Sequence, residues 1–78
     1  MINVKLFGLL RLDSGIREIK LEASSVKEVY AALESASDML SAEKLDACVL
    51  LVNGKKAKKN VRLNDGDELS FLSPVAGG

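Results

Sequence analysis

The stretch SVKEVYAAL, residues 25–33, decides the fold because it predicts a helix with one apolar face. It opens with a capping box, in which the Ser25 hydroxyl accepts a hydrogen bond from the Glu28 amide and the Glu28 carboxylate accepts one from the Ser25 amide. Apolar side chains then return every three or four residues, at Val26, Val29, Tyr30 and Leu33. We expect this helix to end near Ser37 and to need a second layer that covers its apolar face.

Two segments upstream of the helix predict strands of that second layer. Residues 2–6 alternate apolar and polar types, so the apolar ones should face the core and Phe7 should face the other way. Residues 13–15, Asp-Ser-Gly, mark a turn, and residues 16–21 predict a second strand. Together they predict an N-terminal hairpin.

The segments after the helix predict a second hairpin. Residues 39–46 predict one short further helical turn. Residues 47–52, ACVLLV, form a continuous apolar run without helical spacing, which predicts a buried strand. Asn53-Gly54 then predicts a tight turn, because both residue types tolerate positive φ. A lysine-rich segment returns from this turn.

The last strand is predicted at residues 69–72, after a polar turn at residues 63–68, LNDGDE. Alternation along this strand places Leu69 and Phe71 toward the core and leaves Leu72 facing outward. The elements together predict a single α+β domain, in which one main helix covers one face of a mixed sheet of four to five strands.

The composition excludes several classes of function. The chain has 78 residues, enough for one modest core, and its eleven basic and eleven acidic residues cancel. A neutral chain gives no general reason to expect nucleic acid or an anionic membrane as partner. The chain has no histidine and one cysteine, which excludes a histidine base and an internal disulfide, and we expect no metal site. We also expect no membrane span and no signal peptide, and therefore a reducing, cytoplasmic location.

The segment Pro74-Val75-Ala76-Gly77-Gly78 is the leading candidate for chemistry. A terminal carboxylate on Gly78, preceded by Gly77, is the least hindered acyl group that a protein offers. Pro74 fixes its own φ and cannot donate to a sheet ladder, so it should end the strand and begin a protruding tail over residues 74–78. The alternative is a terminus without function that frays into solvent.

Several other residues are candidates for a functional site. Phe7 and Leu72, expected on the outer face of neighbouring strands, predict an association patch. Cys48 lies in an apolar run, where we expect a structural role. Asp65 and Asp67 flank a glycine and are best explained as turn formers. One basic cluster remains, made of Lys55, Lys56, Lys58, Lys59 and Arg62. A solvated hairpin that protects a sheet edge is the favoured interpretation. A nucleic-acid surface and steering of an acidic partner are the alternatives, and the first lacks aromatic residues for base stacking.

The chain resembles the MoaD/ThiS sulfur carriers, which are small ubiquitin-like proteins of the β-grasp fold. The resemblance is carried by LNDGDEL at residues 63–69 with PVAGG at residues 74–78, and by VKLF at residues 4–7 with Arg11 after it. The proline and valine before the diglycine are more similar to the molybdopterin-synthase branch than to the thiamine branch. Two residues depart from that branch, namely Lys56, where an apolar residue is expected, and Ser73, where a second proline is common.

The resemblance implies a carrier rather than an enzyme. An adenylating enzyme of the MoeB/ThiF type would consume ATP to activate the Gly78 carboxylate, and sulfur would then displace AMP to leave a thiocarboxylate. No cofactor would be bound to the carrier itself. A large synthase subunit of the MoaE type, or a thiazole synthase, would receive the sulfur. The resemblance assigns partner binding to Phe7, Leu72 and Arg11.

Two other functions fit the same residues. A ubiquitin-like modifier of the small archaeal modifier type would join Gly78 to target lysines, because the same activated carboxylate serves an amine nucleophile. A plain β-grasp interaction domain would leave the C-terminus inert. The sequence does not separate the first of these from a carrier, since the outcome depends on the nucleophile that meets the adenylate.

Overall fold

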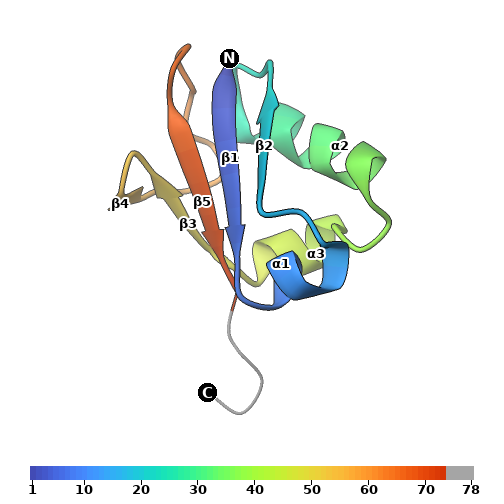
Figure 1. The fold of residues 1–78 in the computed structure, drawn as a ribbon. Coiled ribbons are helices and arrows are strands. Elements are labelled where there is room, and N and C mark those ends of the chain that lie inside the picture. Colours follow the sequence, from blue (N-terminus) through green and yellow to red (C-terminus); the bar gives the residue numbers. More distant parts are fainter. Residues whose placement is uncertain (74–78) are drawn as a thin grey trace.

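The computed structural model describes residues 1–73 and shows one mixed sheet with helices on one side (Figure 1). The sheet order is β2-β1-β5-β3-β4. The central strands β1 and β5 are parallel, whereas the other neighbouring pairs are antiparallel. The α+β class and the five-stranded mixed sheet are confirmed. The strands are β1 (Ile2–Phe7), β2 (Glu18–Leu21), β3 (Val49–Val52), β4 (Lys55–Lys56) and β5 (Glu68–Leu72).

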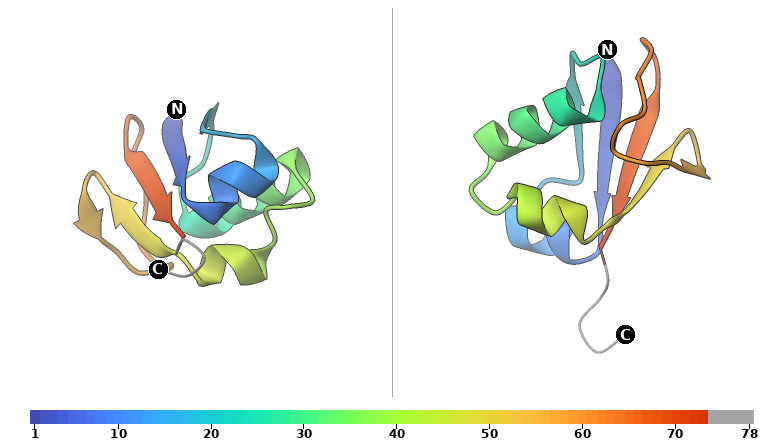
Figure 2. Two further views of the ribbon diagram at one scale, coloured as in Figure 1. Left: turned by 60° about the horizontal axis from the view of Figure 1, so that its bottom comes forward. Right: turned by 180° about the vertical axis from the view of Figure 1, so that it is seen from behind.

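The helices cover one face of this sheet and leave the other face open (Figures 1 and 2). The main helix is α2 (Val26–Ala36), and two shorter ones, α1 (Leu9–Ser14) and α3 (Ala42–Asp46), lie toward one end of the strands. Side chains between the two layers form the core, and the buried ones are Ile2, Val4, Leu6, Leu10, Val26, Val29, Leu33, Leu40, Leu45, Leu50, Leu63, Leu69 and Phe71. The predicted inward faces of residues 2–6 and 69–72 are confirmed.

Helix α2 begins and ends where the sequence predicts. The Ser25 hydroxyl accepts from the Glu28 amide at 3.2 Å, and Ser37 is the C-cap. The other half of the expected capping box was wrong, because the Glu28 carboxylate accepts from Ser24 instead of the Ser25 amide. Ser24 offers it two donors, the amide at 2.6 Å and the hydroxyl at 3.0 Å. These hydrogen bonds lower the pKa of Glu28.

The connection between β1 and β2 differs from the prediction. The two strands do pair as an antiparallel hairpin, but α1 lies between them. Leu10 is the only buried residue of α1, so no apolar period marked the helix in the sequence. The expected turn at residues 13–15 is instead the end of α1, where Gly15 adopts φ 74° and donates to the Arg11 carbonyl at 2.9 Å. The strand that follows begins at Glu18.

The predicted strand at residues 47–52 is shorter and less buried than expected. Strand β3 covers Val49–Val52, and only Leu50 of its residues is buried. Alternate residues of a strand point to opposite faces, so every second residue of β3 points to the face that the helices within residues 1–73 leave uncovered. The turn at Asn53-Gly54 is confirmed by positive φ angles of 52° and 84°. The short helical turn expected within residues 39–46 is α3.

Candidate functional site

Three apolar side chains lie side by side on the open face, at the end of β5. Phe7 of β1 is paired with Leu72 of β5, and Leu72 is paired in turn with Val49 of β3. We call Phe7, Leu72 and Val49 the apolar row. Phe7 is 39% exposed and Val49 is 43% exposed, so the row is accessible to a partner. The predicted neighbourhood of Phe7 and Leu72 is therefore confirmed as a position, while their role in binding stays a prediction.

Val49 was missed as a surface residue. It belongs to an apolar run that was interpreted as buried throughout, since a run without polar residues hides which face is outward. The signal that reveals it is the register of the sheet, because a strand antiparallel to β5 must place the partner of Leu72 on the same face. That register cannot be obtained from β3 alone.

A basic cleft borders the apolar row on the side of β2. It has a volume of about 730 Å³ and includes Phe7 and Arg11 in its lining. Lys5 and Arg17 add two further positive charges, and Glu18 is the acidic residue of the lining. The structure thus brings the predicted residues Phe7 and Arg11 together. A lining of this composition is complementary to acidic groups.

The end of β5 is held by Ser73, the last described residue. Its hydroxyl donates to the Phe7 carbonyl at 2.7 Å and accepts from the Leu10 amide at 3.1 Å. We call these two hydrogen bonds the Ser73 clamp. Strand β5 therefore reaches its end beside the apolar row. The predicted tail residues, Pro74, Val75, Ala76, Gly77 and Gly78, lie outside the described residues.

Two residues of the basic cluster lie at an edge of the sheet. Lys55 and Lys56 form β4, an edge strand, and both are exposed. Lys56, where the resemblance predicts an apolar residue, is paired with Leu51. Leu51 faces the open side of the sheet, so Lys56 lies near the apolar row without belonging to it. Lys59 is engaged elsewhere, in an ion pair with Asp46 at 2.8 Å.

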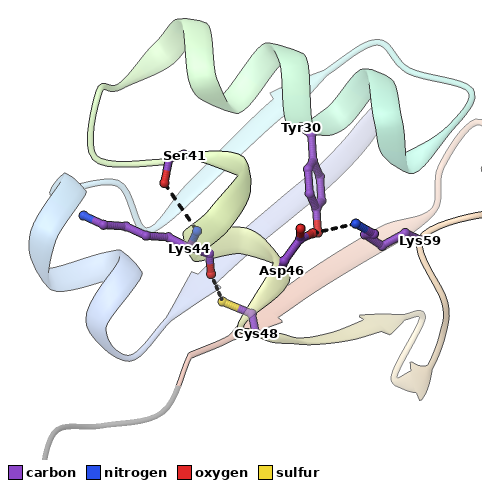
Figure 3. Close-up of polar contacts among 6 residues, drawn as sticks. All are labelled: Tyr30, Ser41, Lys44, Asp46, Cys48 and Lys59. Carbon is purple, nitrogen blue, oxygen red and sulfur yellow. Dashed lines mark hydrogen bonds and ion pairs between the residues drawn. The ribbon is translucent and has the colours of Figure 1, made fainter.

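Asp46 joins Lys59 to Tyr30 of α2 (Figure 3). The Tyr30 hydroxyl donates to the same carboxylate oxygen at 2.9 Å. Partial burial raises the pKa of Tyr30, and the hydrogen bond to Asp46 raises it further, so the phenol stays protonated. Hydrogen bonds from Lys59 and Tyr30 lower the pKa of Asp46. Asp46 of α3 thus links Tyr30 of α2 to Lys59, and the charges of Asp46 and Lys59 are paired with each other.

Cys48 follows α3 (Figure 3), and it is half-buried. Its thiol donates to the Lys44 carbonyl at 3.3 Å, and its side chain packs against the core. Burial raises the pKa of Cys48, which disfavours the nucleophilic thiolate. These contacts fit the structural role predicted for this residue.

Asp67 forms the turn before β5. Its carboxylate accepts from the Asn64 amide at 2.8 Å and from the Asn53 side chain at 3.0 Å. These bonds lower the pKa of Asp67, and Gly66 beside it has a φ of 91°. Within residues 1–73, no three acidic or cysteine side chains gather as a metal site would require. The turn-forming interpretation of Asp67 is confirmed.

None of the helices in the described part of the chain is long and apolar enough to cross a membrane.

Comparison with known proteins decides the family. The model of the ThiS family matches residues 4–78. The chain belongs to the ThiS family. The family match confirms the MoaD/ThiS resemblance inferred from the sequence. A comparison with curated proteins gives no match.

Solved structures agree with this family. SAMP1 from Haloferax volcanii is 28% identical over 99% of this chain and 98% of that one, with a TM-score of 0.85. A chain in the complex of subunits 1 and 2 of molybdopterin-converting factor from Helicobacter pylori 26695 is 31% identical over 99% and 97%, with a TM-score of 0.74. A chain in the BexX/CysO complex from Amycolatopsis orientalis is 25% identical over 100% of both chains, with a TM-score of 0.78.

These similarities confirm the ubiquitin-like β-grasp fold and place the ThiS-family chain among ubiquitin-like sulfur carriers and modifiers. Two of the similar structures are complexes with a second protein, one between two subunits of molybdopterin-converting factor and one between BexX and CysO. The members of this group differ in role.

Proposed function

We propose that this chain is a sulfur carrier, a protein cosubstrate rather than an enzyme, whose reactive group is the Gly78 carboxylate. A carboxylate oxygen attacks the α-phosphorus of ATP in a partner enzyme of the MoeB/ThiF type, and pyrophosphate leaves. Sulfide then attacks the acyl carbon and displaces AMP, which gives a thiocarboxylate. Two successive displacements each have a lower activation barrier than the direct transfer of sulfur to an unactivated carboxylate would have.

The observation that carries this proposal is the position of the apolar row at the end of β5. Leu72 belongs to the row, and Ser73 is held against Phe7 next to it. The five residues that follow, PVAGG, can extend at most about 18 Å. A partner that docks on the row is therefore within reach of the Gly78 carboxylate while the folded domain stays outside its active site.

The small subunit of molybdopterin synthase is the branch that we favour. The 31% identity to a chain of the molybdopterin-converting factor complex supports it, and so does the Pro74-Val75 pair before the diglycine. In this role a large subunit of the MoaE type covers the apolar row and receives the sulfur. A thiazole synthase would take its place in the thiamine branch.

A protein modifier is the second candidate, because the TM-score of 0.85 to SAMP1 exceeds that to the molybdopterin-converting factor chain. In that role a lysine amine attacks the activated Gly78 carbonyl, and an isopeptide bond forms. The two functions share the first step and differ in the nucleophile of the second.

Intact mass spectrometry tests the proposal. The chain is incubated with a MoeB-type adenylating enzyme, ATP and sulfide, and then digested to locate any change. A mass gain equal to the replacement of one oxygen by sulfur at Gly78 is the expected result. A variant with one alanine appended after Gly78 is the matched control and should gain nothing. Unchanged mass together with higher-mass conjugates in a lysate would favour the modifier, and absence of ATP consumption would refute both.

A further inference from the structure

Helix α1 receives its N-terminal cap from a residue far along the chain. Its N-cap position is Gly8, which has no side chain to accept from the first amides of the helix. The Leu10 amide, at the second position of the helix, donates instead to the Ser73 hydroxyl at 3.1 Å, across 63 residues of sequence. A serine oxygen that accepts from this amide is the usual N-cap interaction. Ser73 therefore completes α1 from the end of β5.

The same hydroxyl also fixes Ser73 to β1. It donates to the Phe7 carbonyl at 2.7 Å, whereas the backbone amide of Ser73 reaches that carbonyl only at 3.4 Å. The backbone bond is longer than a normal N–H···O bond, so the side chain supplies the stronger attachment. Gly8 makes room for this contact, since a Cβ there would lie 2.4 Å from the Ser73 carbonyl oxygen.

We propose that Ser73 is a positioning residue, which fixes where residues 74–78 start relative to the apolar row. The inference rests on the proposed function, because a fixed start matters only if Gly78 must enter a partner's active site. Phe7 takes part twice, since its side chain lies in the row and its carbonyl accepts from Ser73. A partner seated on Phe7 thus meets Ser73, the residue that precedes the tail, at a fixed position. Arg11 lies on the helix that Ser73 caps, so its backbone position is also fixed relative to Ser73.

Two alanine variants separate positioning from stability. Ser73→Ala removes the clamp. Ser14→Ala is the matched control, because the Ser14 hydroxyl also makes two hydrogen bonds, to the Leu10 carbonyl at 2.6 Å and from the Ile16 amide at 3.1 Å. Both variants affect α1, and we expect each to lower Tm by about 5 °C. Only Ser73→Ala changes the attachment of β5.

The first readout is ATP–pyrophosphate exchange by a MoeB-type enzyme with the carrier as variable substrate. Ser73→Ala should lower kcat about tenfold, because a misplaced reacting group loses rate, while KM changes less than about twofold with the apolar row intact. Ser73→Thr keeps the hydroxyl and should restore most of the rate. Ser14→Ala should behave as the unmodified chain. Equal kcat values for Ser73→Ala and Ser14→Ala would overturn the inference.

The second readout needs no enzyme. Backbone ¹⁵N relaxation of residues 75–78 should show larger-amplitude motion in Ser73→Ala than in Ser14→Ala if the clamp restrains the start of the tail. Identical relaxation in the two variants would overturn the inference even where exchange activity is absent. Failure of the unmodified chain in the exchange assay refutes the proposed function instead, so the two ideas fail by different results.

Discussion

Replacement of Gly8 by alanine should destabilise the domain strongly, because two costs coincide at this residue. Its backbone has φ 73° and ψ −139°, a region that residues with a Cβ enter at a cost of about 1–3 kcal/mol. The new methyl group would also lie 2.4 Å from the backbone oxygen of Ser73, so the two must separate by about 1 Å to reach ordinary contact. That movement breaks the Ser73 clamp, whose hydrogen bonds contribute about 1 kcal/mol each.

The expected loss is therefore about 3–5 kcal/mol in the free energy of unfolding, a large part of the stability of a domain of this size. Urea denaturation followed by linear extrapolation measures it. Gly15→Ala is the matched control, because Gly15 has a similar φ of 74° but open space around its Cβ position. This control should cost only about 1–2 kcal/mol, the cost of the left-handed backbone alone.

The contribution of the clamp can be isolated with a double variant. If Gly8→Ala acts partly through Ser73, its effect in a Ser73→Ala background should be smaller by at least about 0.5 kcal/mol, since the two residues are in contact. A Gly8→Ala variant that loses no more stability than Gly15→Ala would refute the reasoning, and strict additivity with Ser73→Ala would show that the clamp survives the substitution.

Three further variants test the core, the apolar row and the turn before β5. Phe71→Ala should cost about 3–5 kcal/mol in urea denaturation, because Phe71 is 0% exposed; a loss near zero would mean that the core is assigned wrongly. Phe7→Glu should weaken binding to a MoeB-type enzyme by about 2 kcal/mol in a calorimetric titration while Tm stays within a few degrees, and a collapse of Tm would instead place Phe7 in the core. The pKa of Asp67 is lowered in the fold, so its contribution to stability is present above its ordinary value of 3.8 and is lost as pH falls through the lower folded value. Asp67→Asn should flatten this part of the acid denaturation profile, and an unchanged profile would contradict the assignment.

Much of the fold could be predicted from local patterns in the sequence. The Ser25 cap and the period that follows located α2 at both ends, because capping and one-sided burial act within a few residues. Alternation gave the inward faces of β1 and β5 for the same reason. The turn at Asn53-Gly54 was equally local, since its positive φ angles depend on the residue types themselves.

What the sequence did not reveal depends on contacts between distant residues. Helix α1 has one buried side chain and a glycine at its N-cap, and its missing cap is supplied by Ser73. Val49 was hidden in an apolar run until the register with Leu72 assigned its face. In both cases the deciding partner is a residue at the end of β5. Local patterns therefore indicated Phe7 and Leu72 as candidates, whereas the positions of Val49 and Ser73 beside them depend on the structure.

The central position of β5 has a consequence for how the chain folds during synthesis. β5 lies between β1 and β3, yet it is made after the other four strands of residues 1–73. Until it emerges, the β1–β2 hairpin and the β3–β4 hairpin share no edge, and the buried side chains Leu69 and Phe71 are missing from the core. A chain interrupted before residue 68 thus lacks the strand that joins the two hairpins, and the edges of β1 and β3 that β5 would cover have no partner. Completion of the fold and arrival of the apolar row beside the tail are a single event, so a partner that recognises this row selects molecules whose synthesis has passed β5.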